Sequence, residues 1–301
     1  MSKIKIFPIY HNKSILFQSD VYEPIQTGCS NTDLELGILK DNTGDHISNK
    51  NTQLGELTAW YWIWKNYLPQ HPELEYIGFC HYRRFLDFNR APSWGINQPF
   101  AKEFYFQEFK DLFFNSFTEE MINNSINHFD VILPQKRNLL KNTIYQQYIS
   151  GHNKKDIELL MELIRSDYPD YVEDMNNFLH NKSGYFCLNF VMKVELFDEM
   201  MTWSFDILNK LENKIDFTRY VDYFLVRTPA FIIERFFNVW LIHQIKIKNL
   251  KILERESYLL IPEFEKKKKM LPGVFYIKKT ILKILFFMVE KLKSTDLPKN
   301  N

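Results

Sequence analysis

The chain has 301 residues, of which 45% are hydrophobic and 16% aromatic, enough apolar material for a sizeable core and too much for a disordered chain. Its formal net charge of +1 gives no overall attraction for nucleic acid. The three cysteines are far apart and form no Cys-x-x-Cys pair, which argues against a disulfide framework and a zinc site. The sequence also contains no signal peptide and no apolar run of about 20 residues, so we expect a cytoplasmic protein without a transmembrane helix.

Strands and helices alternate over residues 1–262, and this alternation predicts an α/β domain. Short apolar stretches predict buried strands at 4–9, 76–80, 130–134 and 186–192. Helical spacing predicts helices over 53–68, within 100–128, and over 152–181, 194–213 and 220–245. Residues 20–51 are rich in turn formers and are expected to form a loop.

The C-terminal segment 263–301 has a different composition and is predicted to be a separate tail. Four lysines at 266–269 precede an amphipathic helix over about 274–292, with lysines on one face and large apolar residues on the other. Such a helix is too short and too charged to cross a bilayer, but it could lie flat on an anionic membrane surface. The alternative is a helix that packs on the α/β domain.

Basic and aromatic groups follow two of the predicted strands. Tyr10 and His11 follow the first, and His81-Tyr82-Arg83-Arg84 ends the second. In open α/β sheets, ligands bind outside the carboxyl ends of strands, and guanidinium groups pair well with phosphate oxygens. The sequence therefore suggests a diphosphate site, although arginines that form ordinary surface ion pairs would give the same pattern.

Two glutamates have an ambiguous setting. Glu56 lies at the start of an aromatic helix, where it could either stabilise the helix dipole or face a cleft. Glu234 lies in a very apolar helix, and two interpretations remain open. It could form a buried ion pair with Arg227 or Arg235, or it could act as a general base.

Several common motifs are absent from the sequence. No Asp-x-Asp follows a predicted strand, and the chain has no P-loop, no Gly-x-Ser-x-Gly and no dinucleotide-binding glycine motif. No metal ligands can therefore be assigned, although a divalent cation such as Mg²⁺ or Mn²⁺ remains open.

The chain resembles a bacterial family, formerly of unknown function, that is found in capsular and exopolysaccharide gene clusters and regarded as GT-A-type glycosyltransferases. The stretches that carry the resemblance are 41–48 with Asn51, 56–66, 76–84, 130–137, 183–184, 197–212 and 227–241. The resemblance implies a GT-A-like, Rossmann-like mixed sheet flanked by helices. It also implies a cytoplasmic enzyme, peripheral on the inner membrane.

The implied reaction moves a sugar, of galactosyl or galactofuranosyl type, from a nucleotide-diphosphate donor such as a UDP-sugar. The acceptor would be a growing polysaccharide or a lipid-linked oligosaccharide. The residues assigned to donor binding are Tyr10, His11, Glu56, His81, Tyr82, Arg83 and Arg84; those assigned to acceptor binding are Arg227 and Arg235. Arg83 and Arg84 would stabilise the leaving group, and Glu234 or Asp130 would be the catalytic base. A sugar-phosphate transferase and a non-catalytic, membrane-docked adaptor of capsule assembly remain as alternatives.

Overall fold

The computed structural model describes residues 3–89, 101–215, 220 and 222–261. The chain divides into two compact units, Met1–Leu260 and Ile261–Asn301. The predicted tail at 263–301 lies outside the described residues, so its helix and its boundary at residue 262 remain predictions.

A seven-stranded mixed sheet forms the centre of the first unit, in the order β11-β7-β10-β4-β1-β2-β3. Its strands are β1 (Ile4–Tyr10), β2 (Ile25–Gln26), β3 (Leu39–Lys40), β4 (Tyr76–His81), β7 (Val131–Pro134), β10 (Phe190–Lys193) and β11 (Ile252–Arg255). Neighbouring strands are parallel except that β10 runs antiparallel to both β4 and β7. This mixed sheet confirms the predicted α/β class.

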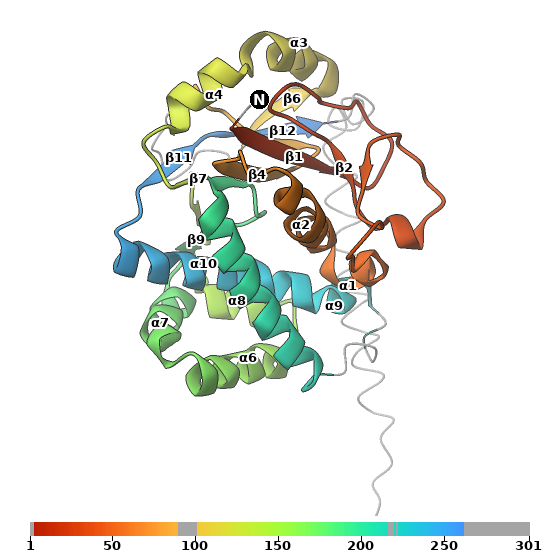
Figure 1. The fold of residues 1–301 in the computed structure, drawn as a ribbon. Coiled ribbons are helices and arrows are strands. Elements are labelled where there is room, and N and C mark those ends of the chain that lie inside the picture. Colours follow the sequence, from red (N-terminus) through yellow and green to blue (C-terminus); the bar gives the residue numbers. More distant parts are fainter. Residues whose placement is uncertain (1–2, 90–100, 216–219, 221, 262–301) are drawn as a thin grey trace, which may run out of the picture. The chain divides into compact units, whose positions relative to one another are not determined.

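The two faces of the sheet bury different sets of side chains because successive residues of a strand point in opposite directions. In β1, Phe7 and Ile9 pack on one face, whereas Ile4 and Ile6 pack on the other. The first face is covered by α2 (Leu57–Trp62), α8 (Val194–Glu212) and α10 (Thr228–Lys248). The second is covered by α3 (Phe106–Ser116) and α4 (Glu119–Ile126), as Figure 1 shows.

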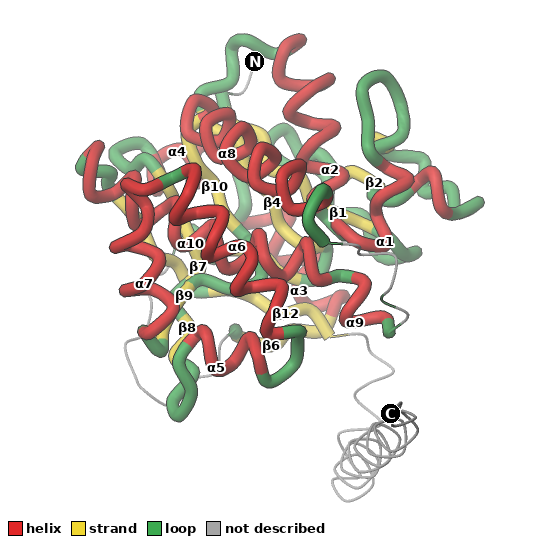
Figure 2. The backbone as a smooth tube through the Cα atoms, turned by 90° about the horizontal axis from the view of Figure 1, so that it is seen from below, coloured by secondary structure: helices red, strands yellow, loops and turns green. Residues whose placement is uncertain are grey.

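The remaining elements are short or lie around this core. The helices are η1 (Cys29–Asn31), η2 (Ser48–Lys50), α1 (Asn51–Leu54), η3 (Ile63–Tyr67), η4 (Leu68–Gln70), α5 (Ile144–Ile149), α6 (Lys154–Asp167), η5 (Pro169–Tyr171), α7 (Val172–His180) and α9 (Tyr223–Val226). A three-stranded sheet contains β5 (Arg84–Leu86), β12 (Ser257–Ile261) and β6 (Lys102–Tyr105). A two-stranded ribbon contains β8 (Arg137–Asn138) and β9 (Ser183–Gly184), which lie side by side in Figure 2.

The structure interrupts four of the predicted elements. The helix expected over 220–245 is described as two helices, α9 (Tyr223–Val226) and α10 (Thr228–Lys248), separated at Arg227. The helix expected over 53–68 breaks at Gly55, whose φ of 55° lies in the left-handed region. The helix expected over 152–181 is divided at Pro169. The strand expected over 186–192 begins only at Phe190, because Cys187 and Leu188 both have positive φ. Among the described residues, no helix is long and apolar enough to cross a membrane.

Candidate active site

The carboxyl ends of β1 and β4 lie side by side, since the two strands are parallel and Ile9 pairs with His81. The rings of His11 and His81 have centroids 5.6 Å apart, and the ring of Tyr82 lies 5.3 Å from that of His11. The structure thus brings together the polar groups that follow the two strands, at the edge where ligands bind in such sheets.

Arg83 and Arg84 lie at this edge without a carboxylate partner. Both side chains are half-buried, and neither forms an ion pair within the described part of the chain. The Nε atom of Arg83 is buried and has no hydrogen-bond partner there, while its guanidinium lies 5.6 Å from the centre of the Tyr82 ring. Two unpaired guanidiniums in a partly desolvated place are suited to an anion. Among the described residues, neither arginine therefore forms the ordinary surface ion pair that was the alternative interpretation.

His81 is held as a neutral imidazole. Its Nδ1 accepts the backbone N–H of Arg83 at 3.2 Å, which leaves the proton on Nε2. Burial, and then the charges of Arg84, His11 and Arg83, lower the pKa of His81 to about 2. Burial and Arg83 also lower the pKa of His11. His81 is therefore a hydrogen-bond donor at Nε2 throughout the physiological range.

Tyr10 does not face the site. Its side chain is fully buried, its hydroxyl donates to the carbonyl of Ile15 at 3.0 Å, and it accepts the N–H of Phe17 at 3.0 Å. Its ring stacks on that of Tyr82. Tyr10 therefore supports the loop after β1, and its position does not suit the predicted contact with the donor.

Glu56 lies between α1 and α2, next to the break at Gly55. A Cβ atom at Gly55 would lie 2.6 Å from Nη2 of Arg227, so glycine allows that guanidinium to approach the backbone. Burial, followed by the charge of Glu234, raises the pKa of Glu56 to about 7, despite the opposing charges of Arg84 and Arg227. The carboxyl group of Glu56 has no hydrogen bond or ion pair with any described residue. A partnerless carboxyl group with such a pKa is a candidate acid or base.

A buried carboxylate that sequence reasoning treated only as a turn former holds this segment in place. Asp41 is fully buried and accepts the N–H groups of Gly28 at 2.8 Å and Cys29 at 3.0 Å. It also accepts the hydroxyls of Ser48 and Thr58, each at 2.6 Å. Since Thr58 is two residues after Glu56, Asp41 fixes the start of α2 to the loop before it.

Asn51 completes this arrangement. Its Nδ2 donates to the carbonyl oxygen of Gly55 at 2.7 Å and lies 3.0 Å from Oγ1 of Thr58. The backbone on both sides of Glu56 is therefore anchored. The only sequence signal for these residues was that Asp41, Asn51 and Thr58 lie within the stretches that carry the family resemblance.

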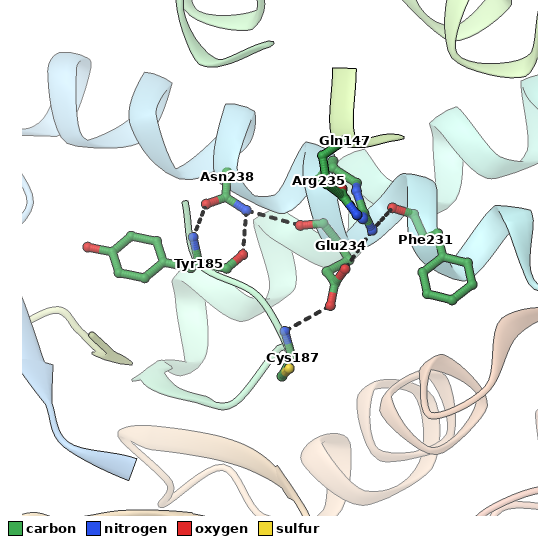
Figure 3. Close-up of polar contacts among 7 residues, drawn as sticks. All are labelled: Gln147, Tyr185, Cys187, Phe231, Glu234, Arg235 and Asn238. Atoms are coloured by element: carbon green, nitrogen blue, oxygen red, sulfur yellow. Dashed lines mark hydrogen bonds and ion pairs between the residues drawn. The ribbon is translucent and has the colours of Figure 1, made fainter. Parts of the chain in front are cut away.

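Glu234, by contrast, has a partner for each oxygen (Figure 3). Its Oε1 accepts the backbone N–H of Cys187 at 2.8 Å, and its Oε2 lies 2.6 Å from Nη1 of Arg235. Asn238, one turn further along α10, donates to and accepts from the backbone of Tyr185. These side chains hold the 185–188 turn, whose positive φ values need such support.

The side chain of Arg235 is only 5% exposed, and it also contacts the carbonyl of Phe231 and Oε1 of Gln147. The sequence left two interpretations of Glu234 open, a buried ion pair and a general base. The structure shows the ion pair, with Arg235. Arg235 is too enclosed for the predicted contact with an acceptor.

Asp130 lies away from the other predicted residues. It precedes β7, which runs in the same direction as β4, so it is at the opposite edge of the sheet from His81. It forms an ion pair with Lys193 at 2.7 Å and accepts the N–H of Lys251 at 2.7 Å. This place does not suit the predicted role as catalytic base. The residues that the structure brings together are His11, Glu56, His81, Tyr82, Arg83, Arg84 and Arg227, with Glu234 nearby.

The side chains at this site do not fit a divalent cation. Within the described ranges, no group of three or more His, Cys, Asp or Glu side chains converges as metal ligands would. The two histidines lie within reach of the charges of Arg83 and Arg227, which would repel a dication.

A cavity of about 330 Å³ lies elsewhere, between the α1–α2 segment and α8. Its lining includes Lys50, Tyr61, Trp64, Phe205 and Glu212, but none of the residues of the strand-end cluster. The chemistry at the strand ends, rather than this cavity, defines the candidate site.

Comparison with solved structures gives the class of protein to which this fold belongs. The chain superimposes on the apo structure of the bifunctional glycosyltransferase WbbM with a TM-score of 0.77 and 29% sequence identity. The match covers 85% of this chain and 45% of that chain, so this chain corresponds to less than half of WbbM. The mixed sheet flanked by helices is therefore a glycosyltransferase fold, as the resemblance implied.

Residues 5–245 match the family described as a domain of unknown function, DUF4422, and the chain belongs to that family. No curated protein matches the chain significantly. The family and the structural neighbour together confirm the predicted GT-A-like family and support a glycosyltransferase.

Proposed function

We propose that the chain is a glycosyltransferase that uses a nucleotide-diphosphate sugar and transfers the sugar to a glycan acceptor. The observation that carries the proposal is the pair of half-buried guanidiniums of Arg83 and Arg84, which form no ion pair with a described residue, together with Glu56, whose pKa is about 7 and on which the charge of Arg84 acts. Fixed cations stabilise the charge that develops on a leaving diphosphate, and a carboxyl group titrating near neutrality suits proton removal from a hydroxyl.

In the proposed reaction, an acceptor hydroxyl attacks the anomeric carbon and the bond to the diphosphate breaks. The diphosphate departs with the bonding electrons, and its charge is stabilised by Arg83 and Arg84, with the Nε2–H of His81 as a neutral donor. Glu56 takes the proton of the hydroxyl. In this scheme Glu56 replaces Glu234 and Asp130 as the base, because both of those carboxylates already have partners.

The proposed donor is a UDP-sugar of galactosyl or galactofuranosyl type, and the proposed acceptor is a capsular or exopolysaccharide chain or a lipid-linked oligosaccharide. These finer assignments rest on the family resemblance. Arg227, which approaches the backbone beside Glu56, is the remaining candidate for the acceptor side. We further propose a cytoplasmic enzyme, peripheral on the inner membrane, with segment 263–301 as a basic anchor.

A sugar-phosphate transferase would also need clustered cations. Analysis of the product separates the two reactions, because only the product of a sugar-phosphate transferase would retain phosphate. A non-catalytic adaptor would have little reason to keep an unpaired carboxyl group among arginines. Hydrolysis of a UDP-sugar by the purified protein would speak against the adaptor.

The first experiment is a screen of UDP, UDP-galactose, UDP-galactofuranose and other sugar nucleotides for thermal stabilisation of the full chain. A nucleotide at 100 times its dissociation constant adds about 2.7 kcal/mol to the unfolding free energy, which a melting curve resolves. Arg83→Ala and Arg84→Ala should each cost about 2 kcal/mol of transition-state stabilisation, or about 30-fold in kcat/KM.

Arg165→Ala is the matched control, because Arg165 is exposed on α6 and distant in sequence from the site. If both site variants bind nucleotide and turn over like the control, the proposed phosphate site is wrong.

A further inference from the structure

The β8–β9 ribbon and the loop that follows β8 form a basic surface beside the candidate site. Arg137 pairs with Gly184 across the ribbon, and the N–H of Leu139 donates to the carbonyl of Lys182 at 2.7 Å. The ammonium of Lys136 lies 5.2 Å from the centre of the Tyr185 ring. Tyr185 begins the turn that α10 holds through Glu234 and Asn238 (Figure 3). Through its contact with Tyr185, Lys136 therefore adjoins the structure around the site.

The local charge is strongly unbalanced. Residues 131–153 and 175–194 contain no Asp or Glu, although the chain as a whole has 38 basic and 37 acidic residues. Lys141 and Lys182 are exposed, and neither forms an ion pair with a described residue. Glu254, the acidic group that contacts Tyr185, is engaged by the Tyr185 hydroxyl, which donates to its Oε1 at 2.7 Å. Such a surface favours an anionic partner.

Leu140 lies in the same loop as Lys141, next to Leu139, whose N–H donates to the carbonyl of Lys182, and it breaks two local rules. Its side chain is 62% exposed, and its φ of 59° is in the left-handed region that disfavours a leucine. The side chain of Asn138 fixes this conformation by accepting the N–H of Leu140 at 2.8 Å. An asparagine or glycine at 140 would be more stable in isolation, so an exposed leucine here indicates a contact outside the chain.

We propose that this surface, made of Lys136, Leu140, Lys141 and Lys182, docks on an anionic phospholipid membrane. An exposed apolar side chain in a basic loop matches a bilayer surface, where the leucine enters the acyl boundary and the lysines meet the headgroups. A soluble acidic glycan would satisfy the cations but would have no place for the leucine. Docking here would bring the candidate site to a lipid-linked acceptor, and only this last point rests on the proposed function.

The test measures sedimentation of the full chain with vesicles of phosphatidylglycerol and phosphatidylcholine, and with phosphatidylcholine alone. The double variant Lys141→Glu/Lys182→Glu should lose at least about tenfold in partitioning to the anionic vesicles. Lys110→Glu/Lys155→Glu is the control, since it makes the same change in net charge at exposed positions of α3 and α6. All variants keep segment 263–301, so its contribution is common to them.

Leu140→Asn separates docking from folding, because asparagine tolerates a positive φ. We expect an unchanged or higher melting temperature together with an about threefold loss of vesicle binding, compared with Ile247→Ser at another exposed apolar position. If the charge variant binds vesicles as its control does, the proposal is overturned. It is equally overturned if Leu140→Asn has no effect and dextran sulfate binds the chain as tightly as vesicles do. Neither result depends on a transferase assay.

Discussion

Glu56 lies close enough to Glu234 for the charge of Glu234 to raise its pKa, yet the surroundings of the two carboxylates are opposite. Glu56 has no hydrogen bond or ion pair with a described residue, and burial raises its pKa to about 7. Glu234 is bonded to the N–H of Cys187 and to Arg235, and it holds a turn with an unfavourable backbone. Both are glutamates at helical positions in aromatic sequence, so the difference arises from what the fold places around them.

This contrast distinguishes a group available for chemistry from a group committed to structure. A buried carboxyl group without a partner is costly, and a protein retains it where a ligand or reaction uses it. A carboxylate with both oxygens engaged contributes to the fold and has little capacity left for proton transfer. The same distinction separates the unpaired Arg83 and Arg84 from the enclosed Arg235.

The largest expected effect is on turnover. Glu56→Gln should lower kcat by about 10²–10⁴-fold, the usual contribution of a general base, while the fold stays intact. In the unchanged enzyme, kcat/KM should rise with pH and level off above a pKa of about 7, because the base must be ionised. Glu162→Gln, at an exposed position of α6, is the control. Full activity of Glu56→Gln would remove Glu56 from the mechanism.

The next effect is on stability, and it should have opposite signs at the two sites. Glu234→Gln leaves Arg235 buried without a counter-charge and should lower the unfolding free energy by about 3 kcal/mol. Glu56→Gln should raise it at pH 8 by up to about 3 kcal/mol, because the folded protein then no longer holds an ionised, desolvated carboxylate.

The folded pKa of Glu56 lies above the unfolded value of 4.5, so this gain should grow as the pH rises from about 4.5 to 7 and should be small below 4.5. Denaturant unfolding at several pH values measures both variants. A stable and fully active Glu234→Gln would contradict both the structural role assigned here and the catalytic role that the sequence suggested.

The sequence predicted the parts of the fold that depend on long hydrophobic patterns. The strands β1, β4 and β7 and the helix α8 are within a few residues of the predicted ranges, whereas α10 begins eight residues after the start predicted for the helix over 220–245. The two-residue strands β2 and β3 could not be predicted, since two residues carry no periodicity. The break at Gly55 and the turn before β10 depend on tertiary contacts, with Arg227 in one case and Glu234 in the other.

The sequence predicted where the candidate site lies, but it did not predict the role of each side chain. The rule that ligands bind at strand ends led to His81, Arg83 and Arg84, because these residues directly follow a buried strand. The same rule also selected Tyr10, whose side chain points into the core. Whether a glutamate keeps a carboxyl group without partners depends on its burial and on its neighbours in the fold. These depend on packing between distant segments; Glu56 and Glu234, for example, are 178 residues apart. The prediction of a membrane-docked tail remains untested.

The smallest expected effect concerns Thr58, through which Asp41 holds the backbone beside Glu56. Thr58→Val keeps the shape but removes the hydroxyl that donates to Asp41 at 2.6 Å, and should cost about 1–2 kcal/mol of stability. Thr58→Ser retains the donor and is the matched control. Because the start of α2 would also loosen, the pKa of Glu56, measured by NMR of its labelled carboxyl carbon, should move toward the ordinary value of 4.5 in the valine variant alone. An equal loss of stability without any change in this pKa would mean that Asp41 stabilises the loop but does not position Glu56.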